Sequence, residues 1–213
     1  MRLQGKLPLL LSLTMIIVLS TLAYFRIIGL DGLAYFMTLT IVVLYGLWIV
    51  VEGEIAAKEV AKENTRADKG TMELYAASRG FTVVAALALE PLFYSPILMT
   101  VGLALFLFSV SFRLLAIYTL GRHYSHRVRI LEDHSIIQSG PYRLVRHPAY
   151  TGMFLAHLGF VLFFFNWLSL GVLVFLLLPS IIVRILHEEK ALMNVRGYRE
   201  YSSQVKRLIP VIW

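Results

Sequence analysis

Six runs of apolar residues, separated by short polar segments, dominate the sequence. They cover residues 7–24, 33–51, 81–93, 97–115, 150–165 and 168–185. Because a helix rises about 1.5 Å per residue, most of these runs are long enough to reach across a hydrocarbon core about 30 Å thick. The third run is shorter than the others and contains Glu90 and Pro91. The pattern predicts an all-α integral membrane protein with about six transmembrane helical segments.

The composition points to the same class of protein. Apolar residues make up 58% of the chain and charged residues 15%, whereas soluble domains average roughly 45–50% and about 25%. The chain has no cysteine, which excludes disulfides, a thiolate nucleophile and cysteine-ligated metal. On a membrane protein, a net charge of +7 is more typical of contact with anionic headgroups than of nucleic-acid binding. The predicted partner is therefore the lipid bilayer, with no nucleic acid.

The positive charges are distributed unevenly between the two sets of predicted loops. The segments on one side are residues 25–32, 94–96 and 166–167, and they contain only Arg26 of the 20 lysine and arginine residues. Cytoplasmic loops of membrane proteins carry an excess of Lys and Arg. The sequence therefore predicts a multi-pass protein with both its N-terminus and its C-terminus in the cytoplasm. Polar chemistry is predicted on that same side.

The chain divides into two parts after the fourth apolar run. Residues 1–120 hold four predicted spans and a cytoplasmic hairpin at 52–80, which carries six of the 13 acidic residues. Glu and Lys residues three and four apart in this hairpin suit surface ion pairs on a helix. The hairpin is therefore predicted to be solvated, with its turn at residues 68–71. Residues 121–213 form the second part, with a polar loop, the last two spans and a C-terminal helix.

Two polar blocks bracket the last apolar hairpin, one at residues 121–152 and the other at 184–210. Pro148 suits the first turn of the fifth span, because a proline there removes no helical hydrogen bond. Backbone N–H groups around Ala149 and Tyr150 would then be free to face an anion or a carboxylate.

A carboxylate and a guanidinium share one face of the sixth span, since Arg184 and Glu188 are four residues apart. If the last two spans form an antiparallel hairpin, this face lies beside His147 and Tyr150. In such an arrangement the protein carboxylate could bind an amine or a ribose hydroxyl of a ligand. The N–H groups at the start of the helix could bind a carboxylate of the ligand, and the aromatic side chain could pack against one of its rings.

Three motifs occur in order around this hairpin. They are His-Ser-Ile-Ile-Gln-Ser-Gly-Pro-Tyr at 134–142, Arg-His-Pro-Ala-Tyr-Thr-Gly at 146–152, and Arg-Ile-Leu-His-Glu-Glu-Lys-Ala-Leu at 184–192, followed by Tyr198 and Tyr201. Together they resemble the isoprenylcysteine carboxyl methyltransferase and phospholipid methyltransferase family, whose members are integral membrane enzymes that use S-adenosylmethionine. The resemblance covers residues 121–213, whereas the first four spans match only in being hydrophobic.

The resemblance implies roles for individual residues. Cofactor contacts are implied for His134, Ser135, Ile136, Ile137, Tyr142, His147, Pro148, Ala149, Tyr150 and Glu188. Arg184 matches the position that the family uses toward the methyl acceptor, so Arg184 and Glu188 are the candidate catalytic residues. The chain departs from the family at 195–198, where Val-Arg-Gly-Tyr replaces Phe-Gly-Glu/Asp-Tyr. This departure affects the expected packing of the last helix.

The implied reaction is direct displacement of the methyl group from the sulfonium of S-adenosylmethionine. Such a step needs alignment and desolvation more than acid–base chemistry. We expect an amphiphilic acceptor, lipid-like or of the isoprenylcysteine type, that enters from the bilayer. No metal is expected, because His157 in the fifth span has no second ligand near it at the right spacing and is better explained by packing.

Other functions also fit the apolar pattern. A methyltransferase for a small soluble thiol or amine and a membrane reductase of related architecture are the main alternatives. A small transporter would show charges or broken helices near the middle of the membrane, and only Glu90, His157 and Pro179 weakly meet that description. A non-catalytic scaffold would not need polar blocks clustered on one side.

Overall fold

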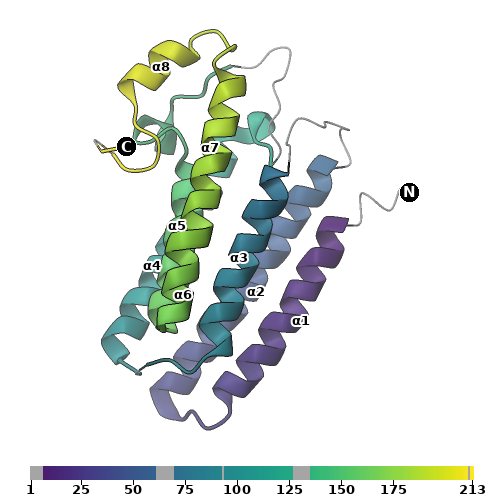
Figure 1. The fold of residues 1–213 in the computed structure, drawn as a ribbon, viewed down its shortest axis with the longest axis vertical. Helices are drawn as coiled ribbons and strands as arrows, with labels where there is room; N and C mark the ends of the chain where they lie inside the picture. Colours follow the sequence, from purple (N-terminus) through teal and green to yellow (C-terminus); the bar gives the residue numbers. More distant parts are fainter. Residues whose placement is uncertain (1–6, 61–69, 93, 127–134, 211) are drawn as a thin grey trace.

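The computed structural model describes residues 7–60, 70–92, 94–126, 135–210 and 212–213, and these residues form helices and no strand (Figure 1). The helices are α1 (Leu7–Ile27), α2 (Gly32–Val60), α3 (Thr71–Ala88), α4 (Pro96–Leu120), α5 (Pro148–Phe163), α6 (Trp167–Val172), α7 (Leu178–Leu192) and α8 (Tyr198–Gln204). Short 3-10 turns lie at η2 (Gly121–His123) and η3 (Gly140–Arg143), and a π-helical segment, η4 (Leu173–Leu177), joins α6 to α7. The predicted all-α class is confirmed.

Four stretches within the described helices are long and apolar enough to cross a membrane. They are Leu10–Ile27, Gly32–Ala57, Pro96–His123 and Trp167–Leu192, and the shorter apolar helix Pro148–Phe163 lies among them. The chain is therefore an integral, multi-pass membrane protein. The third predicted span has different bounds in the structure, because α3 begins at Thr71 and ends at Ala88, before Glu90 and Pro91. The count of six crossings remains a prediction.

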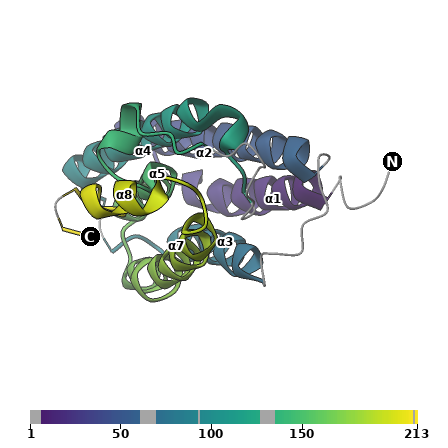
Figure 2. The same ribbon diagram turned by 90° about the horizontal axis from the view of Figure 1, so that it is seen from above.

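α5 lies at the centre of the bundle, with α2 and α4 on one side and α3 and α7 on the other (Figure 2). Its closest neighbour is α4, and glycines make that approach possible. A Cβ atom built on Gly102 of α4 would lie 2.6 Å from the carbonyl oxygen of Gly159 on α5, and one on Gly159 would lie 2.7 Å from the Gly102 carbonyl. Small residues let helix backbones touch in this way. A Cβ on Gly152 would meet Arg113 Cβ at 2.8 Å, so the same contact seats Arg113 beside the start of α5.

The last transmembrane stretch is one helical rod with a π turn in its middle. The π turn of η4 ends just before Pro179, which lies in the first turn of α7. Proline has no N–H to donate to the carbonyl four residues earlier, and its ring crowds that carbonyl, so a locally wider turn accommodates it. The rod then continues as α7 and carries Arg184 and Glu188 to the end of the bundle where α8 lies.

The opposite end of the bundle is closed by polar side chains that bind free carbonyl groups at the end of α3. Arg26 Nε donates to the Leu87 carbonyl at 2.7 Å, and Asn166 Nδ2 donates to the Ala85 carbonyl at 3.2 Å. The last carbonyls of a helix have no partner within it. These two side chains bind such carbonyls and join the last turn of α1 and the loop after α5 to the end of α3. Arg26 also forms an ion pair with Glu90.

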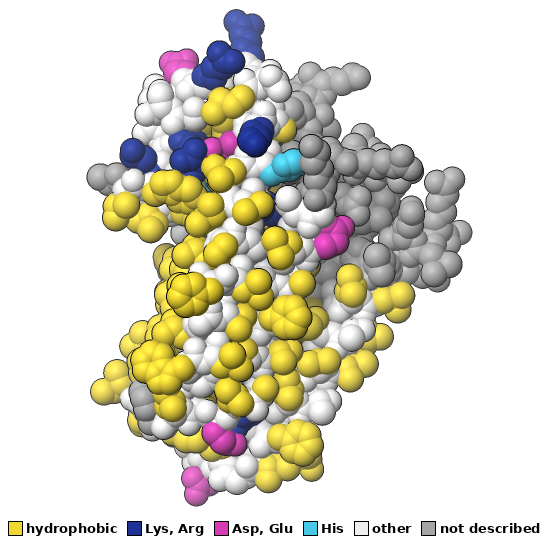
Figure 3. Space-filling model, viewed as in Figure 1, with side chains coloured by type: hydrophobic (Ala, Val, Ile, Leu, Met, Phe, Trp, Pro, Cys, Tyr) yellow, Lys and Arg dark blue, Asp and Glu magenta, His cyan; other side chains and the backbone are white. Residues whose placement is uncertain are grey.

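Charged and apolar side chains occupy different parts of the surface. On the face shown in Figure 3, apolar side chains cover the middle of the molecule, and most Lys and Arg side chains gather at the end that carries α8. We call this end, where α7 meets α8, the pocket end, and the end with Arg26 and Glu90 the far end.

Candidate cofactor and acceptor site

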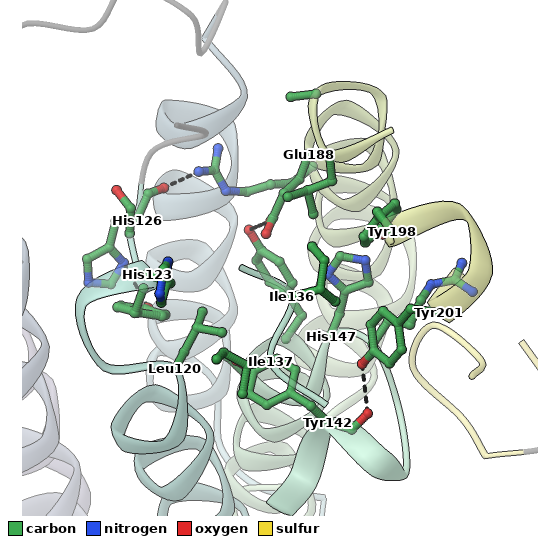
Figure 4. Close-up of a pocket in the computed structure, with 18 of the residues that line it drawn as sticks. Leu120, His123, His126, Ile136, Ile137, Tyr142, His147, Glu188, Tyr198 and Tyr201 are labelled. Carbon is green, nitrogen blue, oxygen red and sulfur yellow. Dashed lines mark hydrogen bonds between the residues drawn. The ribbon is translucent and has the colours of Figure 1, made fainter. Parts of the chain in front are cut away.

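A pocket lies between α3, α4, α5, α7 and α8, at the end of the bundle where α7 meets α8 (Figure 4). Two connecting segments complete its wall, one at residues 123–126, which begins at the end of η2, and the other at 135–137. Residues that are more than 60 positions apart in the sequence therefore share one cavity.

Most of the predicted site residues line this pocket. They are Ser135, Ile136, Ile137, Tyr142, His147, Ala149, Tyr150, Arg184 and Glu188. Pro148 is buried in the first turn of α5 as predicted, but it does not line the pocket. His134 lies outside the described residues. The structure thus brings together residues from all three motifs, although their roles toward a ligand remain predictions.

The predicted pair of α5 and α7 side chains is in direct contact. The Tyr150 hydroxyl donates a hydrogen bond to Glu188 Oε2 at 2.9 Å, and Glu188 is half-buried. One part of the prediction for this helix start is wrong, because the Tyr150 N–H donates to the His147 carbonyl at 3.0 Å. The tight first turn of α5 thus uses an N–H group that the sequence pattern left free for a ligand.

The neighbouring carboxylate, Glu189, anchors the wall of the pocket. It is 4% exposed and accepts hydrogen bonds from Arg146 Nη2 at 2.7 Å and from Arg207 Nε at 2.9 Å. His147 Nε2 lies 3.2 Å from Glu189 Oε1, the oxygen that also accepts from Arg146. The sequence motifs implied a role for Glu188 but none for Glu189. Glu189 proves to be the residue that joins α7, the start of α5 and the C-terminal tail.

The C-terminal tail runs alongside the start of α5. The Arg146 N–H donates to the Lys206 carbonyl at 2.7 Å, and the His147 N–H donates to the Arg207 carbonyl at 3.0 Å. Thr151 Oγ1 donates to the Leu208 carbonyl at 3.0 Å. This pairing holds α8 over the pocket despite the departure from the family pattern at residues 195–198.

Aromatic side chains form one wall of the pocket. Tyr142, Tyr198 and Tyr201 lie together on one side in Figure 4, and all three are buried. The Tyr201 hydroxyl donates to the Tyr142 carbonyl at 2.7 Å. Burial raises the pKa of Tyr201 to about 12 and also raises the pKa of Tyr142, to which the charge of Glu188 contributes. These phenols are therefore uncharged at neutral pH and offer apolar ring faces.

Arg184 is held inside the protein instead of reaching toward headgroups. It is 1% exposed, its Nη1 donates to Thr71 Oγ1 at 3.0 Å, and its Nη2 donates to the His126 carbonyl. The contact with Thr71 joins α7 to the start of α3. A buried guanidinium that lines the pocket suits an anionic group of a ligand.

A buried ion pair that sequence analysis missed supports the opposite wall. Arg113 Nε and Nη2 each donate to one oxygen of Glu52 at 2.7 Å, and Arg113 Nη1 donates to the Ala149 carbonyl at 2.8 Å. Glu52 is 6% exposed, so its placement in a solvated hairpin was wrong. The helix α2 continues past Glu52 to Val60 and turns this carboxylate toward α4. The sequence did contain a signal for this ion pair. Glu52 and Arg113 lie within or next to apolar runs, and a charge in a membrane span usually has a partner.

His126 extends this network toward Arg184. The Tyr124 hydroxyl lies 3.1 Å from Arg113 Nη2 and 3.3 Å from His126 Nδ1. Burial is the main cause that lowers the pKa of His126 to about 4. Nearby Arg113 lowers it further, against the opposing charge of Glu52. His126 is therefore a buried neutral imidazole at pH 7.

His157 has a packing role, as predicted. It is fully buried, lies 3.1 Å from the Tyr45 hydroxyl, and has its Nδ1 2.9 Å from the Met153 carbonyl. Within the part of the chain that the structure describes, no group of three His, Asp or Glu side chains could hold a metal ion.

Comparisons with known proteins match the region of the chain that forms much of this site. Residues 100–194 match the model of the isoprenylcysteine carboxyl methyltransferase (ICMT) family. That region contains the pocket-lining parts of α4, α5 and α7. The family resemblance predicted from the three motifs is confirmed over this region.

Curated relatives match about half of the chain. The probable protein-S-isoprenylcysteine O-methyltransferase of Oryza sativa subsp. japonica is 36% identical over 116 residues, which are 53% of this chain and 61% of the relative. The protein-S-isoprenylcysteine O-methyltransferase of Saccharomyces cerevisiae is 36% identical over 104 residues, 47% of this chain and 44% of the relative. The chain thus matches about half of the length of these relatives.

A solved structure shares the fold along the whole chain. It is that of the eukaryotic intramembrane Ras methyltransferase ICMT, with a TM-score of 0.51 and 18% sequence identity, and the match covers 100% of this chain and 99% of that chain. At this identity the likeness concerns the fold, and it supports the integral membrane class.

Proposed function

We propose that this protein transfers the methyl group of S-adenosylmethionine to the carboxylate of an S-isoprenylcysteine or a similar lipid-tailed acceptor. The observation that carries the proposal is the convergence of the three motifs on one pocket at the end of the membrane helices. The match of residues 100–194 to the methyltransferase family supports it. The names of the rice and yeast relatives support the isoprenylcysteine acceptor.

The donor set of the pocket fits S-adenosylmethionine. The aromatic wall of Tyr142, Tyr198 and Tyr201 offers apolar faces for a purine, and Glu188 offers a carboxylate for an amine, a ribose hydroxyl or a positive sulfur. When bound, this cofactor supplies a methyl group already activated by the positive charge on sulfur. The protein needs only to hold the two reactants in register and to exclude water.

The acceptor side of the pocket fits an anion. Arg113 and Arg184 both line the cavity, and each is 1% exposed. A carboxylate is ionised at neutral pH, so this acceptor needs no general base. The helices α4 and α7, which line the pocket, belong to apolar stretches long enough to cross a membrane, and this suits an acceptor that keeps its tail in the bilayer.

A panel of acceptors tests this proposal. Purified protein in lipid nanodiscs should transfer labelled methyl groups to N-acetyl-S-farnesylcysteine faster than to phosphatidylethanolamine, a small thiol or a small amine. Turnover of only the small soluble acceptors would contradict the acceptor class. Absence of S-adenosylmethionine binding by calorimetry would contradict the methyltransferase function itself and favour the reductase or scaffold alternatives.

Glu188 provides the sharpest test of the cofactor assignment. Glu188→Gln should weaken S-adenosylmethionine binding roughly tenfold to a hundredfold, because a charge-assisted contact is worth about 1.5–3 kcal/mol. Glu200→Gln is the matched control, since Glu200 is exposed on α8 and does not line the pocket. Equal affinities for both variants would reject Glu188 as a cofactor ligand.

We also propose that the pocket end faces the cytoplasm, with both termini on that side. The support is the gathering of Lys and Arg at this end. The chain has no cysteine of its own, so Ser203→Cys on α8 and Asp31→Cys at the far end report the two faces cleanly. Ser203→Cys should react with an impermeant thiol reagent only from the cytoplasmic side, and the reverse pattern would invert the topology.

A further inference from the structure

Tyr75 on α3 has a buried hydroxyl group without a hydrogen-bond partner. Tyr75 is 2% exposed and lines the pocket, and its hydroxyl oxygen makes no hydrogen bond to any residue that the structure describes. Buried polar groups nearly always have a partner, because an unpaired one loses its bonds to water without replacement. A donor left over inside a ligand pocket therefore points to a contact with the ligand.

The ring of Tyr75 is held in place by its neighbours. It packs edge-on against the ring of Tyr150, with the centroids 5.7 Å apart and an angle of 79° between the planes. The guanidinium carbon of Arg79 lies 5.5 Å from its ring centroid, within the range of a cation–π contact. These contacts use the ring faces and edges and leave the hydroxyl for another partner.

Tyr75 belongs to the cationic side of the pocket. One helical turn before it, Thr71 accepts a hydrogen bond from Arg184, which also binds the His126 carbonyl. Figure 4 shows His126 across the cavity from Tyr142, Tyr198 and Tyr201, with Glu188 between the two sides. Arg113 is joined to His126 through Tyr124. One side is therefore aromatic, and the other carries two buried guanidinium groups and the Tyr75 hydroxyl.

The chemistry of the cationic side selects a carboxylate. Glu52 balances the charge of Arg113, so the buried positive charge of Arg184 is the one that favours an anion over a neutral or cationic group here. A phenol O–H is a donor that a carboxylate oxygen accepts well. We infer that the Tyr75 hydroxyl donates a hydrogen bond to the carboxylate of the methyl acceptor and so makes the enzyme prefer an acid over its neutral analogues. This inference rests on the proposed function and adds a specificity residue from α3, outside the region that matches the family.

A carboxylate could reach this place from either of two molecules. The acceptor carries one, and so does the amino-acid end of S-adenosylmethionine. The inference commits to the acceptor, because Glu188 and the aromatic wall on the other side suit the cofactor. The experiment must therefore measure the affinity for each molecule separately.

Tyr75→Phe removes only the hydroxyl and tests the inference in the full chain in nanodiscs. The affinity for N-acetyl-S-farnesylcysteine should fall about tenfold to a hundredfold. The affinity for N-acetyl-S-farnesylcysteamine, which lacks the carboxylate, should change less than about twofold. The affinity for S-adenosylhomocysteine and the thermal midpoint of the ligand-free protein should stay the same, because the lost hydroxyl had no partner within the described protein.

Tyr45→Phe is the matched control. Tyr45 is also 2% exposed, but it binds His157 and does not line the pocket. This variant should bind both farnesyl ligands as the unmodified protein does.

Each contrary result has a distinct meaning. Equal loss for the acid and the analogue without a carboxylate would overturn the inference, as would no loss for either ligand. A loss confined to S-adenosylhomocysteine would assign the hydroxyl to the cofactor and also overturn it. Failure of the unmodified protein to bind or methylate the acid would reject the proposed function, and this inference with it.

Discussion

Arg26 at the far end and Arg113 at the pocket end are both buried, but their partners differ. Arg26 binds the Leu87 carbonyl and pairs with Glu90, whose side chain is 79% exposed. Arg113 holds both oxygens of Glu52, which is itself buried, and it also binds the Ala149 carbonyl and lines the pocket. At the far end the charge closes a helix terminus beside water. At the pocket end, two mutually dependent charges join α2, α4 and the start of α5.

The difference in energy follows from solvation. An ion pair with one exposed partner is worth about 0–1 kcal/mol, since water competes for the charge. In a buried pair, each charge has lost its water, so the removal of one partner leaves the other uncompensated. The two ends should therefore respond very differently to the same substitution.

The largest effect is expected from Glu52→Ala. It leaves the Arg113 guanidinium buried without its carboxylate, and we expect a loss of about 3–5 kcal/mol of stability. Glu90→Ala is the matched change at the far end, with an expected loss of about 0–1 kcal/mol. Thermal unfolding of both variants in detergent measures the contrast, and similar midpoints would remove the distinction between the two ends.

Glu189→Gln sharpens the comparison within the pocket end. The amide keeps the shape of the side chain but weakens the charge-assisted bonds from Arg146 and Arg207, at an expected cost of about 1.5–3 kcal/mol. The tail and α8 should loosen, seen as faster hydrogen exchange at residues 198–208. Glu188→Gln should not affect that exchange, because Glu188 binds Tyr150 instead of the tail. Unchanged exchange in Glu189→Gln would show that the tail is held by its backbone pairing alone.

Arg26→Ala tests whether the far end is only structural. It leaves the Leu87 carbonyl without its side-chain donor, and a loss of about 1–2 kcal/mol is expected from one buried hydrogen bond. The affinity for S-adenosylmethionine, measured by calorimetry below the melting temperature, should not change. A variant that melts normally but binds the cofactor more weakly would show that the two ends are coupled.

The smallest effect is a dependence of stability on pH at His126. Its folded-state pKa of about 4 lies below the unfolded value of about 6.5, so the unfolded chain binds the proton first as the pH falls. The contribution of neutral His126 is complete above about pH 6.5 and is lost as the pH falls toward 4. Between pH 7 and 6 the loss should be less than about 1 kcal/mol. The melting temperature of His126→Asn should therefore depend less on pH than that of the unmodified protein. An identical pH dependence in the two proteins would show that His126 is not its cause.

Local rules were sufficient for most of the helices and for two of the site residues. Apolar runs predicted the long apolar helices, because a helix in a bilayer satisfies its own backbone hydrogen bonds, but they misplaced the bounds of α3. The Arg-His-Pro motif placed the start of α5 at Pro148, since proline fits a first helical turn. A spacing of four put Arg184 and Glu188 on one face of α7, and both line the pocket.

Tertiary packing decided which of those side chains meet. Helical periodicity gives the face on which a residue lies, but the residue opposite depends on how helices from distant parts of the chain approach each other. Glu52 reaches Arg113 because the glycines of α4 and α5 let their backbones touch and seat Arg113 beside α5. The adjacent residues Glu188 and Glu189 point to different neighbours, one to Tyr150 and the other to the C-terminal tail. Their sequence positions are nearly equivalent, and only the packed structure shows which lines the pocket and which joins the tail to the wall.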